Sequence, residues 1–181
     1  MLEVLLLMKE TRLAGDGGAG ASLRIAPLFE EGETLAAATD TMRTMLAIPE
    51  YRAALDSMGG VQEIMIGYSD SNKDVGYLAS SWRLQQAQKQ LASYLDETGV
   101  EYVFFHGRGG SIGRGGGPTN VAIMALPGGT INGRIKITEQ GDVISARYNT
   151  EPIAHRELEL TVGAILAHTV GGDRLTDPEE R

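Results

Sequence analysis

Hydrophobic positions along this chain follow two periods, and their order predicts four short strands separated by helical segments. Apolar runs typical of buried strands cover residues 23–29, 61–68, 100–105 and 134–138. Helical spacing of apolar residues covers 34–46, 49–55, 75–98, 120–126 and 153–168. Because strands that alternate with helices favour parallel pairing, the sequence predicts a helix-rich α/β fold of four strand–helix units.

The expected helix at 75–98 has the clearest apolar face. Leu78, Trp82, Leu91 and Leu95 recur at helical spacing along it. We therefore expect this helix to cover the sheet, with Trp82 as an anchor of the hydrophobic core.

The glycine-rich segment and the two ends of the sequence give further expectations. Residues 15–22 are rich in glycine and predict a flexible loop, and the polar tail at 171–181 is expected to fray. Residues 1–8 are apolar but lack a basic region before them, so they indicate the tail of a helix rather than a signal peptide. Such a start looks like a cut through a longer chain, and we treat 1–181 as a single segment.

Composition narrows the class of protein. The chain has 181 residues, 42% of them hydrophobic, which is enough for one domain with a sizeable core. It contains no cysteine, so disulfides and thiolate sites are excluded and a cytoplasmic location is expected. The net charge of −8 argues against a nucleic-acid partner. No run of ~18 apolar residues is present, so no membrane contact is expected.

The densest chemistry lies in the stretch 104–118, directly after the third expected strand. It contains seven glycines, two arginines (Arg108 and Arg114) and His106. Glycines let a backbone approach a ligand closely, and arginines match phosphate or carboxylate oxygens, so the stretch predicts a mobile anion-binding loop. His106 adds a group expected to titrate near neutrality. A plain linker is the alternative; the spacing excludes a dinucleotide fingerprint, and the chain has no P-loop.

A second group of polar residues follows the second expected strand. Asp70 could bind a divalent metal, although Asp70 or Ser71 could instead cap the following helix. Lys73 is expected near the amino end of that helix, where a cation is unfavourable unless an anionic ligand lies nearby; an exposed lysine is the alternative. Glu30 ends the first strand, and it joins a metal site only if that strand lies beside the one carrying Asp70.

Four segments together resemble the phosphoenolpyruvate carboxylase family, and the similarity runs along nearly the whole chain. They are Ala26–Glu30, Ile64–Asp74, Phe105–Gly116 and Thr138–Gly141. The resemblance implies a helix-rich elaboration of a (β/α)8 TIM-like barrel, of which four units would form half. It also implies conversion of phosphoenolpyruvate and bicarbonate to oxaloacetate and phosphate with Mg²⁺ or Mn²⁺, in a protein that is a tetramer at full length.

The resemblance also implies roles for individual residues. The metal ligands would be Glu30 and Asp70, with Lys73 beside them near the substrate. The phosphate and later intermediates would meet His106 and Arg108. Further contacts to substrate would come from the glycine loop through Gly109, Gly110 and Arg114.

The chain departs from the family in completeness, which leaves other functions open. An essential histidine from an amino-terminal segment, and additional substrate arginines, have no counterpart here. The chain would therefore hold the metal and phosphate half of a site. The alternative is a non-catalytic truncated fragment or assembly module, and a nucleotide-binding phosphotransferase is a third reading. Half a barrel would leave two open edges, so a homo-oligomer is expected. We expect His155 and His168 to be surface or packing residues.

Overall fold

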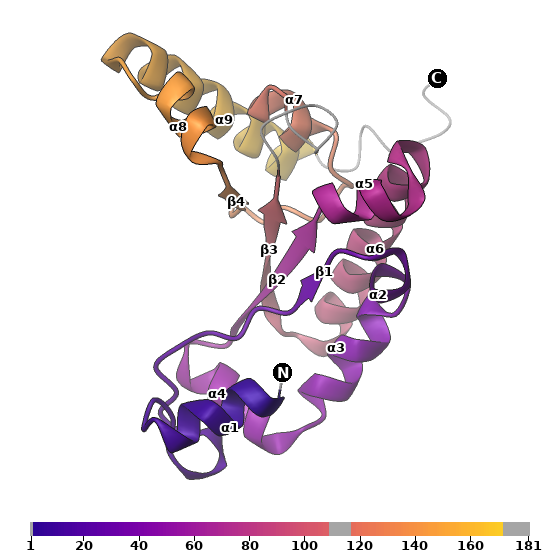
Figure 1. The fold of residues 1–181 in the computed structure, drawn as a ribbon, viewed down its shortest axis with the longest axis vertical. Coiled ribbons are helices and arrows are strands. Elements are labelled where there is room, and N and C mark those ends of the chain that lie inside the picture. The colour runs from indigo at the N-terminus through magenta and orange to yellow at the C-terminus, as the bar shows by residue number, and fades with distance from the viewer. Residues whose placement is uncertain (1, 109–116, 172–181) are drawn as a thin grey trace.

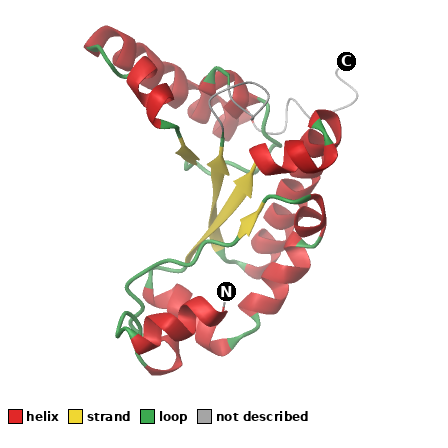
Figure 2. Cartoon of the chain, in the orientation of Figure 1, coloured by secondary structure: helices red, strands yellow, loops and turns green. Residues whose placement is uncertain are grey.

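A computed structural model describes residues 2–108 and 117–171 and shows a helix-rich α/β fold (Figures 1 and 2). The described residues form one four-stranded sheet in which each strand pairs in parallel with the next along the chain. Its strands are β1 (Leu28–Phe29), β2 (Val61–Gly67), β3 (Glu101–Gly107) and β4 (Lys136–Thr138). The predicted parallel α/β architecture is therefore confirmed.

Helical segments occupy most of the chain between and around these strands. Those before β2 are α1 (Leu2–Glu10), the 3₁₀ turn η1 (Asp16–Gly18), α2 (Gly32–Ala36), α3 (Ala38–Leu46) and α4 (Pro49–Ser57). Those after β2 are α5 (Ser69–Val75), α6 (Tyr77–Thr98), α7 (Thr119–Met124), α8 (Gly141–Arg147) and α9 (Glu151–Gly171).

One face of the sheet forms the main core. Burial alternates along β2 and β3, so that every second side chain is enclosed. Ile64, Ile66 and Phe104 on this face pack with Leu91 and Leu95 of α6. Helices α2 and α3 complete the layer beside α6 (Figure 1). The core thus holds the strand ends in a fixed position.

The opposite face of the sheet is only partly buried and carries charge. Glu63 of β2 binds Arg24 at 3.2 Å and Lys136 of β4 at 2.8 Å. Burial alone would raise the pKa of Glu63, but hydrogen bonds from Lys136 and Arg24 outweigh it and lower that pKa. Lys136 also lies 4.5 Å from the ring centroid of Phe105. A charged network therefore ties β2 and β4 across β3 on the face that the main core leaves open.

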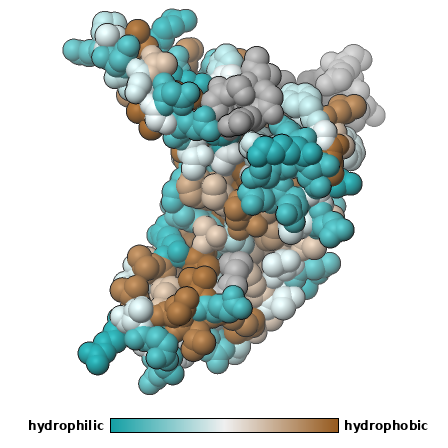
Figure 3. All heavy atoms as spheres, viewed as in Figure 1, coloured by the Kyte–Doolittle hydropathy of each residue, from teal (hydrophilic) through white to brown (hydrophobic). Residues whose placement is uncertain are grey.

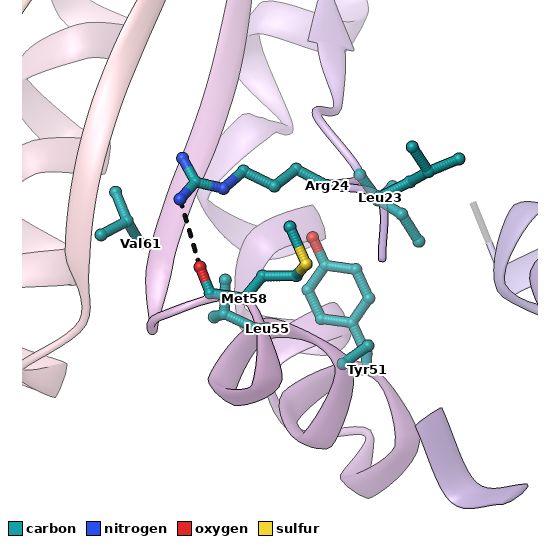
Figure 4. A pocket seen from close by; sticks show the side chains of 8 residues that line it. Leu23, Arg24, Tyr51, Leu55, Met58 and Val61 are labelled. Atoms are coloured by element: carbon teal, nitrogen blue, oxygen red, sulfur yellow. Dashed lines mark hydrogen bonds between the residues drawn. The ribbon is translucent and has the colours of Figure 1, made fainter. Parts of the chain in front are cut away.

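Two smaller clusters lie at the two ends of the sheet. At the amino-terminal edge, α1 packs with α4 through Leu5, Met8 and Ala54. Figure 3 shows apolar surface around this region, and α1 exposes much of it. Nearby, Arg24 donates to the carbonyl oxygen of Met58 at 3.1 Å beside a small apolar cavity (Figure 4). At the carboxyl-terminal edge, α7 and α9 pack through Ile123 and Ala164.

The amino-terminal segment is helical, as its apolar pattern predicts. Its helix, α1, ends at Glu10. None of the helices in the described ranges combines the length and apolarity needed to cross a membrane.

Several element boundaries differ from those expected. The first strand covers only Leu28–Phe29, and the helix predicted at 34–46 is divided into α2 and α3 at Ala37. The helix predicted to begin near residue 75 is two helices, because Gly76 between them has a φ of 81°, which a helix cannot accommodate. The helix α8 was not predicted from the sequence.

The expectation that Trp82 anchors the core is wrong. Its side chain is 66% exposed, and Leu78 one turn earlier is 83% exposed. The first turns of α6 extend past the sheet toward α5, so their apolar residues have no sheet to cover (Figure 1). The residues of α6 that pack in the core begin at Leu84.

The two ends of α6 should respond differently to the same substitution. Leu91→Ala removes a fully buried side chain and should lower the free energy of unfolding by about 2–5 kcal/mol. Leu78→Ala is the matched control on the same helix and should change it by less than about 0.5 kcal/mol. Denaturant unfolding of both variants measures this difference. Equal losses would show that the start of α6 also packs in a core.

Candidate active site

The carboxyl ends of the strands bring the predicted site residues to one edge of the sheet. Glu30 directly follows β1, Asp70 lies in α5 just after β2, and Arg108 directly follows β3. The strands run parallel in register, with Phe29 beside Ile66 and Gly67 beside Gly107. Glu30, Asp70 and Arg108 therefore leave the sheet at neighbouring positions, which is where parallel α/β folds carry their sites.

Glu30 rests directly against the end of β2. A Cβ atom at Gly67 would lie 2.4 Å from the Glu30 Cβ and 3.2 Å from its Oε2. Such distances are too short for any side chain, so glycine at this position lets the first and second strand ends approach. The sequence condition for a shared site is met, because β1 and β2 are adjacent.

Glu30 and Asp70 form a pair of interacting carboxylates. The pKa of Glu30 is raised, first by burial and then by the negative charge of Asp70. Lys73 donates to Asp70 Oδ1 at 2.6 Å from the next turn of α5. Two close carboxylates with one adjacent ammonium retain excess negative charge, which a cation would neutralise.

The pair fits a divalent ion such as Mg²⁺ or Mn²⁺. These ions bind proteins through one or two carboxylates and keep other positions for water and substrate oxygens. Over residues 2–108 and 117–171, no group of three or more acidic, histidine or cysteine side chains is placed to hold a metal. Glu30 and Asp70 could supply two carboxylate ligands, and water and substrate oxygens could supply the others.

The local structure around Lys73 and Ser71 differs from the prediction. Lys73 lies in the last turn of α5, not at the amino end of the long helix. Neither Asp70 nor Ser71 caps that helix, whose N-cap residue is Gly76. Instead, buried Ser71 accepts a hydrogen bond from Ser80 at 2.7 Å. This bond joins α5 to α6 and fixes the short helix that carries Asp70 and Lys73.

His106 lies on the core-facing side of β3 and is 1% exposed. Its Nδ1 is 2.9 Å from the Tyr68 hydroxyl, and its Nε2 has no hydrogen-bond partner among the described residues. Burial, with a smaller contribution from Arg108, lowers its pKa from 6.5 to about 3. The expectation that His106 titrates near neutrality is therefore wrong: the imidazole is neutral. Its contact with a phosphate stays a prediction.

Arg108 provides positive charge beside Tyr68. Its guanidinium carbon lies 5.1 Å from the centroid of the Tyr68 ring, a cation–π distance. The pKa of Arg108 is lowered, first by burial and also by the nearby charge of Arg147. Burial also raises the pKa of Tyr68 to about 12, so this hydroxyl stays protonated. Gly109, Gly110 and Arg114, the other predicted substrate contacts, lie outside the described residues.

Arg147 is a further residue at this edge, and its position was not predicted from the sequence. It donates to Glu139 Oε1 and to the carbonyl oxygen of Gly117, both at 2.7 Å, and to Thr119 Oγ1. It thereby joins the ends of β4 and α8 to the start of α7. The only signal in the sequence was Glu139 itself, a carboxylate after a strand, because α8 was not predicted.

The depressed pKa of His106 predicts how stability depends on pH. Between the ordinary pKa of 6.5 and the folded-state pKa of about 3, His106 is protonated in the unfolded chain but neutral in the folded protein. Stability is thus full above pH 6.5 and falls with decreasing pH by about 1.4 kcal/mol per unit from this residue. His106→Gln should remove that component from the pH profile of unfolding.

The measurement is denaturant unfolding of both proteins between about pH 8 and pH 5, a range that brackets the ordinary histidine pKa. The difference in free energy of unfolding between the two proteins at about pH 8 gives the cost of the substitution itself, because histidine is neutral there in both the folded and the unfolded state. Parallel profiles for the two proteins would contradict the buried, neutral imidazole.

Comparison with known proteins identifies relatives along nearly the whole chain. The family model of phosphoenolpyruvate carboxylase matches residues 1–180. Phosphoenolpyruvate carboxylase of Rhodopseudomonas palustris (strain BisB5) is 47% identical over 178 residues, covering 98% of this chain and 19% of that protein. The Chromobacterium violaceum protein of the same name is 49% identical over 173 residues, covering 94% of this chain and 19% of its own length.

The chain thus spans about a fifth of the length of these relatives. Identity near one half over almost every residue, together with the family match, confirms the resemblance seen in the sequence motifs. The chain belongs to the phosphoenolpyruvate carboxylase family.

Proposed function

We propose that this chain carries the metal- and phosphate-binding part of a phosphoenolpyruvate carboxylase site, which forms oxaloacetate and phosphate from phosphoenolpyruvate and bicarbonate. The observation that carries the proposal is the meeting of Glu30, Asp70 and Lys73 at adjacent strand ends. Arg108 follows the next strand, so acidic metal ligands and a permanent cation share one edge.

Glu30 and Asp70 would hold Mg²⁺ or Mn²⁺. The bound ion would supply Lewis-acid stabilisation of negative charge on a substrate oxygen. The pKa of Glu30 is raised first by burial and then by repulsion from Asp70, and a divalent cation would relieve that repulsion. The contact with Gly67 orients Glu30, and the Ser80–Ser71 bond fixes the helix that carries Asp70.

Lys73 and Arg108 would bind the phosphate. Phosphoryl transfer gains most from positioning and from charge complementarity, and both side chains are restrained by neighbours. Lys73 is held by Asp70, and the Arg108 guanidinium lies over the Tyr68 ring. Neutral His106 would act through hydrogen bonding rather than charge. Arg114, Gly109 and Gly110 are proposed as further substrate contacts on the strength of the resemblance alone.

Four consecutive parallel strands with one open face suit half of a (β/α)8 barrel, and we propose this assignment for residues 1–181 as a single segment. The open face with Glu63 and Phe105 would then line the barrel interior. Among the described residues, β1 and β4 have no strand on their outer sides, which supports association into a homo-oligomer. A cytoplasmic location agrees with the absence of cysteine.

A second candidate is a module that binds metal and phosphate without turnover. This candidate is favoured because the chain covers only 19% of the length of these relatives. Binding and turnover must therefore be measured separately.

Metal binding should depend on both carboxylates. Glu30→Gln or Asp70→Asn should weaken Mn²⁺ binding about tenfold or more, since even supporting partners of metal ligands are worth that much. Titration calorimetry or the electron paramagnetic resonance signal of free Mn²⁺ measures the affinity.

Matched controls come from exposed acids elsewhere at helix starts. Glu33→Gln in α2 and Asp142→Asn in α8 make the same chemical changes and should leave Mn²⁺ affinity unchanged. Equal effects of the site and control variants would remove the Glu30–Asp70 pair as the metal site.

Turnover is tested by a coupled assay for oxaloacetate with phosphoenolpyruvate, bicarbonate and Mg²⁺, and with a metal-free control. Metal-dependent product formation that Asp70→Asn abolishes would show that the chain is an active carboxylase. Binding of phosphoenolpyruvate in the presence of Mn²⁺ without product would favour the module. If the chain shows no binding of phosphoenolpyruvate and no turnover, the proposed function is overturned.

A further inference from the structure

A cavity of about 240 Å³ lies between α6 and α7, beside the ends of β2 and β3. It is separate from the Glu30–Asp70 pair, neither member of which lines it. Its lining includes Tyr68, Tyr77, Leu84, Gln88, Arg108 and Ala125. Its size suits a small molecule with a single ring.

Gln88 gives this cavity an unsatisfied polar group. The side chain is 1% exposed, and its amide nitrogen donates to the carbonyl oxygen of Leu84 at 3.0 Å. Its Oε1 has no hydrogen-bond partner in the described part of the chain. A buried acceptor without a partner is unfavourable and uncommon in folded proteins. A ligand with a hydroxyl or amine donor would satisfy it.

Apolar and aromatic side chains share the remaining lining with the polar residues Asn72, Ser81 and Gln85. Leu84 is buried in the wall, and Ala122, Ala125 and Leu126 add apolar surface from the α7 side. Tyr77, which is 62% exposed, adds an aromatic ring to the lining. Side chains of this kind favour a flat, apolar ligand body.

Arg108 sets the charge of the ligand. Its guanidinium is permanently cationic and offers several donors in a planar fork. Because it lines the same cavity as Gln88, a ligand that binds here meets a cation and a hydrogen-bond acceptor at different points of one pocket.

We propose that this cavity binds a small hydroxylated or aminated aromatic acid. The carboxylate pairs with Arg108, the ring packs against Leu84 and Ala125, and the donor binds Gln88 Oε1. Gln88 was not singled out by the sequence, because a glutamine on a long helix looks like a surface residue. Because the proposed function also assigns Arg108 to the phosphate, phosphoenolpyruvate and this ligand would share its guanidinium.

The test uses 4-hydroxybenzoate as the probe, followed by methyl NMR and titration calorimetry. We expect saturable binding with a dissociation constant on the order of 1 mM, as suits ten non-hydrogen atoms. Methyl shifts should occur at Leu84, Ala122 and Ala125, while Ile64 in the main core serves as the unshifted reference.

Two simpler probes separate the contributions. Benzoate lacks the donor and phenol lacks the carboxylate, so each should bind about tenfold more weakly than 4-hydroxybenzoate. Gln88→Met keeps the side-chain size but removes the acceptor, and should abolish the preference for 4-hydroxybenzoate over benzoate. Gln90→Met is the matched control, since Gln90 is exposed on the same helix, and should keep that preference.

A third variant tests the same cavity independently, in case Gln88→Met does not fold. Ala122→Phe fills the cavity from the α7 side and should abolish binding of all three probes. The proposal is overturned by a lack of saturable binding, by shifts confined to other residues, or by a preference that persists in Gln88→Met. Binding that survives Ala122→Phe would equally place the probe elsewhere.

Discussion

The contact between Glu30 and Gly67 is the constraint on which the candidate site depends. Parallel pairing of β1 with β2 brings the carboxylate of one strand end onto the backbone of the next, at a distance that leaves no room for a side chain at position 67. This contact sets how near Glu30 comes to Asp70, and hence how strongly the two carboxylates repel. Any larger residue there would separate the acidic pair without altering either acid.

The electrostatics of the site follow from that geometry and from burial. The acidic pair keeps excess negative charge, whereas Arg108 and Arg147 concentrate positive charge one to two strands away. His106 between them is too deeply buried to carry charge, so it separates the two regions as a neutral group. The edge of the sheet thus presents an acidic side and a basic side, which suits a metal and a phosphate respectively.

Sequence reasoning succeeded where local pattern and topology agree. The apolar runs located all four strands, and parallel pairing then required that Glu30, Asp70 and Arg108 share an edge. It failed where tertiary context decides. Periodicity placed Trp82 in the core, but it cannot tell which turns of a helix extend beyond a sheet. The break at Gly76 depends on a single backbone angle, and α8 is too short and polar to show a periodic pattern. The neutrality of His106 reflects which face of β3 is covered, and the helix layer determines that.

The strand order also bears on how the chain acquires its structure. Each of β2, β3 and β4 pairs with the strand that precedes it in the sequence, so its partner has already been synthesised. During synthesis each new strand–helix unit can dock on a completed neighbour, and loop-closure entropy stays small at every step. The acidic pair and the Ser80–Ser71 bond that fixes α5 can both form once α6 has emerged, before β3 is made. Assembly of the site is therefore vectorial, with its negative half formed first and its positive half added to it.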